Sequence, residues 1–326
     1  MNSKPLVSIC CAAYNHEPYI RDALEGFVMQ KTDFLFEVII NDDASTDKTA
    51  EIIKEYETKY PDIIKPNYQV ENKYSKGIRP STITFKLAKG KYVALCEGDD
   101  YWTDSLKLQK QVDEMEKHPE CDMSFHPALV IYDDGSKKNE YRTYLKTGNK
   151  IIPPEEIIRN GGGFCPTASL MFRKEVLSDL PEWFNDAPVG DQFLQIHGAL
   201  RGGAVYIDEP MSVYRRMVNK SWSDNMKNLK YALSHNNKRV RYLERFNKDL
   251  NYKYNDEFKY QISFWLWDSA WRSLSENKHS DFKKYIMQSW NIYAKISTKQ
   301  AILFYCRNIP FLNLPVKAMT LVKSIK

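Results

Sequence analysis

Apolar runs alternate with helix-like segments through the first part of the chain, and this alternation constrains the fold more than any other feature. Residues 6–13 and 92–96 are nearly continuous apolar runs, as in parallel strands that are covered on both faces. Residues 36–40 form a similar run, and apolar residues between these runs recur at helical spacing. Such alternation builds right-handed crossover units. The sequence therefore predicts an α/β fold with a mostly parallel sheet flanked by helices.

The same alternation extends to residue 223, and a second, helical region is predicted after it. We divide the chain into residues 1–223 and residues 224–326. Further strands of the first region are expected at 63–70, 121–132, 168–172, 205–208 and 211–214, and helices near 83–87, 108–115, 154–156 and 188–200.

Polar clusters follow three of the predicted strands. Tyr14-Asn15 comes after the first strand, Asp42-Asp43 after the second, and Glu97–Asp100 after the strand at 92–96. Ligands of such sheets bind at the carboxyl ends of the strands. The carboxylates of the third cluster repel each other, and a hard cation with oxygen ligands would relieve that repulsion. An acidic turn without a metal is the simpler alternative, but the shared position at strand ends favours metal chemistry.

Several protein classes are disfavoured by what the sequence lacks. Nowhere do eighteen apolar residues run together, so no membrane-spanning helix is predicted. No cleavage-site pattern follows the apolar run at 6–13, which we interpret as a strand of a cytoplasmic protein rather than a signal peptide. Neither G-x-G-x-x-G after the first strand nor G-x-x-x-x-G-K-S/T anywhere is present, which argues against nicotinamide dehydrogenases and P-loop ATPases.

With these clusters placed, residues 5–223 resemble a family 2 glycosyltransferase of the GT-A fold, which is Rossmann-like. The segment Glu37–Asp47 is similar to the family's D-D-G-S-T-D motif, with Ala44 in place of Gly. The E-G-D-D-Y-W segment at 97–102 resembles the D-x-D metal motif of a bacterial branch. Gly190-Asp191 and the segment from Tyr214 to Ser223 are similar to acceptor-side motifs of that branch. The resemblance implies a GT-A catalytic domain with a C-terminal helical extension.

The resemblance also implies roles for individual residues. Asp99, supported by Asp100, would bind Mn²⁺ or Mg²⁺ at the diphosphate of a nucleotide-sugar, and Asp191 would be the general base. Tyr14 would lie against the uracil ring of a UDP-sugar, and Asp42 or Asp43 would accept the N–H of the base. The implied donor-binding set is Tyr14, Asn15, Asp42, Asp43, Glu97, Gly98, Asp99 and Arg215, and the acceptor side comprises Trp102, Gly190 and Trp222.

The chemistry suits these roles. A sugar hydroxyl that attacks the anomeric carbon must lose its proton, which a carboxylate can take. The departing diphosphate gains negative charge, which a cation offsets. Attack opposite the diphosphate inverts the anomeric configuration. Two residues depart from the family pattern: Glu97 replaces the usual first Asp, and Met217 stands where a His is common.

The second region is strongly basic. Residues 224–326 carry 19 Lys and Arg residues against 8 Asp and Glu residues, whereas residues 1–223 carry 28 against 34. Helices are predicted at 229–250, 258–275 and 282–296, and the aromatic stripe Phe264, Trp267 and Trp271 is interpreted as a packing face. In residues 301–326, basic residues alternate with apolar ones and no acidic residue occurs. This pattern favours an interfacial helix on an anionic membrane, at the inner face of the cell membrane, over a nucleic-acid partner.

Three hypotheses of function remain open. The leading one is an inverting, metal-dependent transferase that moves a sugar to a glycan or lipid-linked saccharide in surface-polysaccharide biosynthesis. A catalytically silent nucleotide-sugar or glycan-binding module would explain the departures at Glu97 and Met217. A sugar nucleotidyltransferase also uses metal-bound carboxylates near a sheet edge, but it would release pyrophosphate from UTP.

Overall fold

The computed structural model of the protein describes residues 4–132, 135, 137–216 and 222–309, of which residues 222 and 223 are described by their backbone alone. The chain divides into two compact units, Met1–Asn219 and Lys220–Lys326. We refer to the first as the α/β unit and to the second as the helical unit, and each is described by itself.

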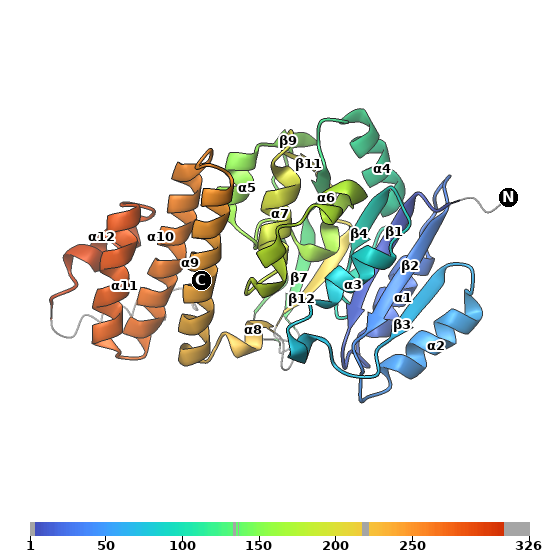
Figure 1. Cartoon of the computed structure of the whole chain (residues 1–326), viewed down its shortest axis with the longest axis horizontal. Helices are drawn as coiled ribbons and strands as arrows, with labels where there is room; N and C mark the ends of the chain where they lie inside the picture. Colours follow the sequence, from blue (N-terminus) through green and yellow to red (C-terminus); the bar gives the residue numbers. More distant parts are fainter. Residues whose placement is uncertain (1–3, 133–134, 136, 217–221, 310–326) are drawn as a thin grey trace. The chain divides into compact units, whose positions relative to one another are not determined.

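A mixed sheet of eight strands forms the centre of the α/β unit (Figure 1). Its order is β3-β2-β1-β4-β10-β6-β11-β9. The parallel half contains β1 (Val7–Ala13), β2 (Phe36–Asp42), β3 (Ile64–Tyr68) and β4 (Tyr92–Leu95); the other half contains β6 (Met123–Phe125), β9 (Lys150–Ile152), β10 (Met171–Arg173) and β11 (Ala204–Tyr206). The expected α/β fold with a mostly parallel sheet is therefore confirmed, although β10 is antiparallel to both of its neighbours.

The register of the parallel half brings the predicted polar clusters to one edge. Ala13 at the end of β1 pairs with Asp42 at the end of β2, and Cys10 of β1 pairs with Leu95 at the end of β4. The segments that follow these three strands therefore leave the sheet at the same end. Strand residues of β1 and β2 are almost completely buried, which explains their continuous apolar character.

Helices cover the parallel half of the sheet. They are α1 (Ile20–Val28), α2 (Thr49–Lys59), α3 (Pro80–Leu87) and α4 (Lys107–Lys117). Phe27 of α1 is fully buried and meets the Trp102 ring edge-on at 5.0 Å between centroids. Burying one side chain of this size contributes about 2–3 kcal/mol. The α1 helix is thus fixed over the core below the segment that carries Trp102.

A second sheet of four strands has the order β5-β12-β7-β8. Its strands are β5 (Tyr101–Trp102), β7 (Ala128–Tyr132), β8 (Glu140–Arg142) and β12 (Ser212–Arg216). The single long strand predicted at 121–132 is wrong, because β6 and β7 belong to different sheets. Pro127 lies at the break and has no backbone N–H to donate to a strand ladder, so the chain changes sheets there.

The remaining helices of the α/β unit are α5 (Pro154–Asn160), α6 (Lys174–Ser178) and α7 (Asp191–Ala199). Short 3₁₀ turns at Tyr74–Lys76, Thr167–Ser169 and Glu182–Asp186 complete its regular structure. The helix α7 begins at Asp191, within the segment 188–200 where the sequence predicts a helix.

The helical unit contains α8 (Trp222–Asn225), α9 (Leu229–Asp249), α10 (Asn255–Ser275), α11 (His279–Ile292) and α12 (Thr298–Tyr305). The helix α10 packs against both α9 and α11, and α12 packs against α11 (Figure 1). Inside the unit, the Gln300 side chain donates hydrogen bonds to the hydroxyls of Ser289 at 2.8 Å and Ser263 at 3.1 Å. This buried polar cluster fixes α12 on α10 and α11. No helix among the described residues is long and apolar enough to cross a membrane.

Candidate active site

Asp42, the last residue of β2, and Asp43 are buried, and the carboxylates of both accept hydrogen bonds from protein groups. Asp43 accepts backbone N–H groups from Lys73 at 2.8 Å and Tyr74 at 3.0 Å, one on each carboxylate oxygen. The Ser45 hydroxyl donates to Asp42. Burial raises the pKa of Asp42, and the hydrogen bonds from Ser45 oppose that increase. Because the two carboxylates hold Ser45 and the backbone of residues 73–74 by hydrogen bonds, the Asp42-Asp43 turn is a fixed part of the strand-end site.

Tyr14 and Asn15 follow β1, and Asn15 contacts the segment directly after the Asp42-Asp43 turn. Asn15 has a left-handed backbone with φ 55°, and its amide oxygen accepts the backbone N–H of Thr46 at 2.8 Å. Its own N–H donates to the Ser45 hydroxyl at 3.0 Å. Tyr14 is 44% exposed. The Asn15 side chain thus fixes the turn, while the Tyr14 ring keeps an accessible face for an aromatic ligand.

Close packing at Gly98 holds the Glu97–Asp100 turn against β1. The Gly98 N–H donates to the carbonyl of Ala12 at 2.9 Å. A Cβ at this position would lie 2.8 Å from His16 Nδ1 and 3.0 Å from Ile20 Cδ1, so a larger residue would push the turn away. The structure therefore gives Gly98 a packing role, and sequence reasoning missed His16 as its neighbour.

Glu97 lies among charged groups from three other segments. Burial, with the negative charges of Asp99 and Asp191, raises the pKa of the Glu97 carboxyl to about 8, while Arg79 opposes the increase. The Glu97 side chain is exposed to solvent, and the two neighbouring carboxylates act on it there. The structure thus places Asp191 close enough to Glu97 and Asp99 for its charge to act on Glu97, although Asp191 is far from both in the sequence.

Asp99 and Asp100 differ in how they are satisfied. The Asp100 carboxylate is buried and accepts the backbone N–H of Arg215 at 2.8 Å. Burial and the neighbouring charge of Asp99 raise the pKa of Asp100. Asp99 Oδ1 is also buried, yet no donor among the described residues reaches it. A buried carboxylate oxygen without a donor is costly unless a ligand satisfies it.

Arg215 contacts protein groups around this turn. Its guanidinium donates to the Asp99 carbonyl at 2.8 Å, forms an ion pair with Asp22, and lies over the Tyr101 ring at 4.5 Å. Only 9% of the residue is exposed. Its observed contacts support the shape of the acidic turn, and its predicted donor-binding role stays a prediction.

Asp191 begins α7 and faces the same region. Its carboxylate lies 3.4 Å from the position of a Cβ added at Gly162. The run of three glycines at 161–163 therefore passes close to Asp191. Its charge also contributes to a raised pKa at Tyr214, whose main cause is burial. The structure therefore places Gly162, the middle residue of the three glycines at 161–163, beside the predicted base.

Arg79 is the principal residue that sequence reasoning missed. Its guanidinium donates to the Ala187 carbonyl at 2.6 Å and lies over the Phe184 ring at 5.3 Å. Burial lowers the pKa of Arg79, and the charges of Asp191 and Glu97 oppose this decrease. A Cβ at Gly190 would lie 3.0 Å from Arg79 Nη1. The only sequence signal was an Arg-Pro pair before a short helix, which by itself indicates no site.

The residues present fit a cation that shares its coordination shell with a ligand. Among the described residues, no group of three or more His, Cys, Asp or Glu side chains could hold a metal ion by itself. The free Oδ1 of Asp99 supplies one oxygen. Mg²⁺ is commonly bound by one or two carboxylates together with substrate phosphates and water. This arrangement matches the chemistry of a diphosphate ligand.

The predicted acceptor residues are in different positions. Gly190 lies against Arg79 at the start of α7. Trp102 is 2% exposed, and its indole N–H donates to the Ala168 carbonyl at 2.8 Å. It therefore belongs to the core in this structure, and its acceptor role stays a prediction. Met217 and the side chain of Trp222 lie outside the described residues.

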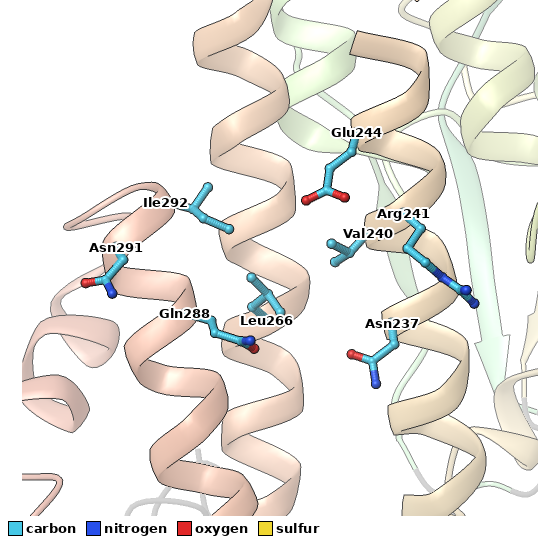
Figure 2. A pocket seen from close by; sticks show the side chains of 8 residues that line it. All are labelled: Asn237, Val240, Arg241, Glu244, Leu266, Gln288, Asn291 and Ile292. Atoms are coloured by element: carbon cyan, nitrogen blue, oxygen red, sulfur yellow. The ribbon is translucent and has the colours of Figure 1, made fainter. Parts of the chain in front are cut away.

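A separate groove of about 440 Å³ lies within the helical unit, between α9, α10 and α11. Val240, Leu266 and Ile292 form its apolar lining, and Glu244 and Gln288 reach toward it from opposite helices (Figure 2). It contains none of the residues predicted for catalysis.

Comparison with protein families gives a match to the model described as glycosyl transferase family 2 over residues 8–180. An uncharacterized protein of Mycobacterium tuberculosis is 41% identical over 218 residues, which cover 66% of this chain and 60% of that protein. The chain thus spans about 60% of the length of this relative. A UDP-Glc:alpha-D-GlcNAc-diphosphoundecaprenol beta-1,3-glucosyltransferase of Escherichia coli is 40% identical over 111 residues, covering 34% of this chain and 41% of that protein.

Solved structures share the fold at low sequence identity. S. aureus TarS 1–349 in complex with UDP-GlcNAc has a TM-score of 0.64 at 16% identity and covers 92% of this chain and 86% of that chain. A mannosyltransferase from Pyrobaculum calidifontis in complex with GDP-Man and Mn²⁺ has a TM-score of 0.55 at 16% identity, covering 99% and 87%. At this level of identity the likeness establishes the fold.

Proposed function

Since the chain belongs to glycosyl transferase family 2, we propose that it is an inverting glycosyltransferase whose α/β unit moves a sugar from a nucleotide-sugar to a hydroxyl of a glycan or lipid-linked saccharide. UDP-sugar is our preferred donor class. The observation that carries the proposal is the convergence of Glu97, Asp99 and Asp191 with Arg79 at the carboxyl ends of the strands. Ligands of open α/β sheets bind at this edge.

The donor would occupy the space between the two acidic turns. The accessible Tyr14 ring offers a stacking face for the base. Asp42 or Asp43 would accept the N–H of the base as a further hydrogen bond, because both carboxylates already accept donors of the protein. Asp99 would hold Mn²⁺ or Mg²⁺, with Asp100 as a supporting ligand, and the cation would offset charge on the departing diphosphate. Arg79 would add a second positive charge there.

The acceptor would approach from the side of α7. Asp191 is placed beside the glycine run and close enough to Glu97 for their charges to interact. As general base it would take the proton of the attacking hydroxyl. Attack from the face opposite the diphosphate needs one base and inverts the anomeric configuration.

Three comparisons support the proposed donor and acceptor classes. TarS binds UDP-GlcNAc and the Pyrobaculum enzyme binds GDP-Man with Mn²⁺. The Escherichia coli relative is named for a UDP-Glc donor and a diphosphoundecaprenol-linked acceptor. We therefore place the reaction in the assembly of a surface polysaccharide on a lipid-linked precursor.

The test is release of the nucleoside diphosphate. Purified protein is incubated with UDP-sugars and GDP-Man, with Mn²⁺ or Mg²⁺ and a lipid extract as acceptor source. We expect release of UDP from one donor and a decrease of roughly 10²–10⁴-fold in Asp191→Asn, because a general base contributes about that much. Asp186→Asn, in the turn before α7, is the matched control.

Two results would contradict the proposal. A wild type that binds UDP-sugar but turns over no faster than Asp191→Asn with any acceptor would be a silent binding module. Release of pyrophosphate from UTP, with no release of UDP from UDP-sugars, would identify a nucleotidyltransferase.

A further inference from the structure

Exposed apolar side chains gather on α11 and α12 of the helical unit. Tyr305 is 69% exposed, Ile302 46% and Met287 45%. Trp290 connects the two helices, because its ring stacks on Phe304 at 4.5 Å and meets Tyr305 edge-on at 5.4 Å. Met287 lies one turn before Trp290 on α11, and Ile302 one turn before Tyr305 on α12. We name Met287, Trp290, Ile302, Phe304 and Tyr305 the α11–α12 face.

Basic residues outnumber acidic ones in the part of the chain that forms this face. The last acidic residue of the chain is Asp281, and residues 282–326 contain eight Lys and Arg residues. Lys283 and Lys284 are exposed one turn before Met287, and Arg307 lies over the Phe304 ring at 4.2 Å. In contrast, the basic residues of α9 are interspersed with Glu244 and Asp249. An uncompensated basic surface favours an anionic partner.

We propose that the α11–α12 face binds an anionic lipid surface, with its exposed apolar side chains in the headgroup region and the adjacent lysines against the lipid phosphates. Aromatic and aliphatic side chains bordered by lysines are the composition of interfacial segments. Each lysine near an anionic leaflet adds electrostatic attraction to the lipid phosphates. The proposal keeps the first part of the segment predicted at 301–326, which lies on α12, and extends the membrane contact to a folded surface that begins on α11; residues 310–326 lie outside the described residues.

Two other occupants fit less well. A nucleic acid would use the lysines but gains little from Ile302 and Met287, which are aliphatic and exposed. A second copy of this chain would place like charges opposite each other. The face therefore has both the apolar and the cationic elements that a lipid surface requires, and a lipid-linked acceptor would give a transferase reason to be there.

The experiment is cosedimentation of the full chain with vesicles of phosphatidylcholine, alone or mixed with phosphatidylglycerol. We expect binding to the mixed vesicles only. Lys283→Glu/Lys284→Glu should lower the partition coefficient at least about tenfold, since two charges are reversed near the surface. Ile302→Ser/Tyr305→Ser should lower it as well, because apolar area no longer enters the headgroup region.

Matched controls carry the same chemical changes elsewhere on the helical unit. Arg245→Glu/Lys248→Glu on α9 repeats the charge reversal, and Tyr252→Ser removes another exposed aromatic ring. Both should bind the mixed vesicles as the wild type does. Circular dichroism and UDP binding of every variant show that folding and the donor site are intact, so failure here is distinguishable from failure of the transferase proposal.

Three results would overturn the proposal. Equal partitioning onto both vesicle types would exclude charge recognition, and equal loss in the α9 control would exclude this face. Retention of binding in both α11–α12 variants, with loss only when residues 310–326 are deleted, would assign the contact to the tail. Binding to duplex DNA in place of vesicles would identify the competing partner.

Discussion

The Asp42-Asp43 turn and the Glu97–Asp100 turn follow strands that flank β1 on either side. The two turns differ in whether protein groups donate hydrogen bonds to their carboxylates. In the first turn, Asp43 accepts two backbone N–H groups and Asp42 accepts the Ser45 hydroxyl. In the second turn, Asp99 Oδ1 is buried without a donor among the described residues. Burial and, to a smaller extent, the negative charges of Asp99 and Asp191 raise the pKa of Glu97 in the same turn.

This difference teaches which acidic residues shape a site and which receive a ligand. Satisfied carboxylates stabilise the fold by holding loops, and their removal should cost stability. Crowded carboxylates without donors destabilise the ligand-free fold, and their removal should cost ligand binding instead.

Asp43→Ala should lower the free energy of unfolding by about 2–5 kcal/mol, because two buried charge-assisted hydrogen bonds are lost and two backbone N–H groups lose their acceptor. Urea unfolding measures the change. The exposed Asp62→Ala is the control, expected within about 0.5 kcal/mol of the wild type. If Asp43→Ala unfolds like the control, the first turn does not hold its loop through this carboxylate.

Arg79→Lys should weaken UDP binding about tenfold, because lysine cannot keep the contact with the Ala187 carbonyl and also present a planar fork to a diphosphate. Calorimetric titration with UDP measures the change. Arg21→Lys, at an exposed ion pair with Glu55, provides the control. Unchanged affinity in Arg79→Lys would remove Arg79 from the donor site.

Asp99→Asn should raise the free energy of unfolding by roughly 1 kcal/mol at pH about 9 in buffer with a chelator, because Glu97, whose pKa is about 8, is then ionised and one of the like charges beside it is removed. The same urea experiment measures this increase, and addition of Mn²⁺ should stabilise the wild type more than the variant. A decrease as large as that expected for Asp43→Ala would show that Asp99 is a structural residue.

The sequence predicted the fold and the site edge because local patterns determine both. Continuous apolar runs identified β1, β2 and β4, and the polar residues after them were expected at the strand ends, where the structure places them. The family resemblance predicted the GT-A-like fold and the family, and both are confirmed.

The rest depends on tertiary contacts that no local pattern encodes. Arg79 reaches the site only because it packs on Phe184 and bonds Ala187, more than a hundred residues later. Trp102 is of a residue type that often binds ligands, yet its ring is enclosed by Phe27 and Lys107. The break between β6 and β7 depended on Pro127, which lay within an otherwise strand-like run.

The central claim is that the second acidic turn receives a cation together with a nucleoside diphosphate. Calorimetric titration of the full chain with UDP, with and without Mn²⁺, tests it in the wild type and in Asp99→Asn. We predict that Mn²⁺ tightens UDP binding to the wild type about tenfold or more and has little effect on the variant. Equal affinity with and without Mn²⁺, or a full Mn²⁺ effect in Asp99→Asn, would contradict the claim.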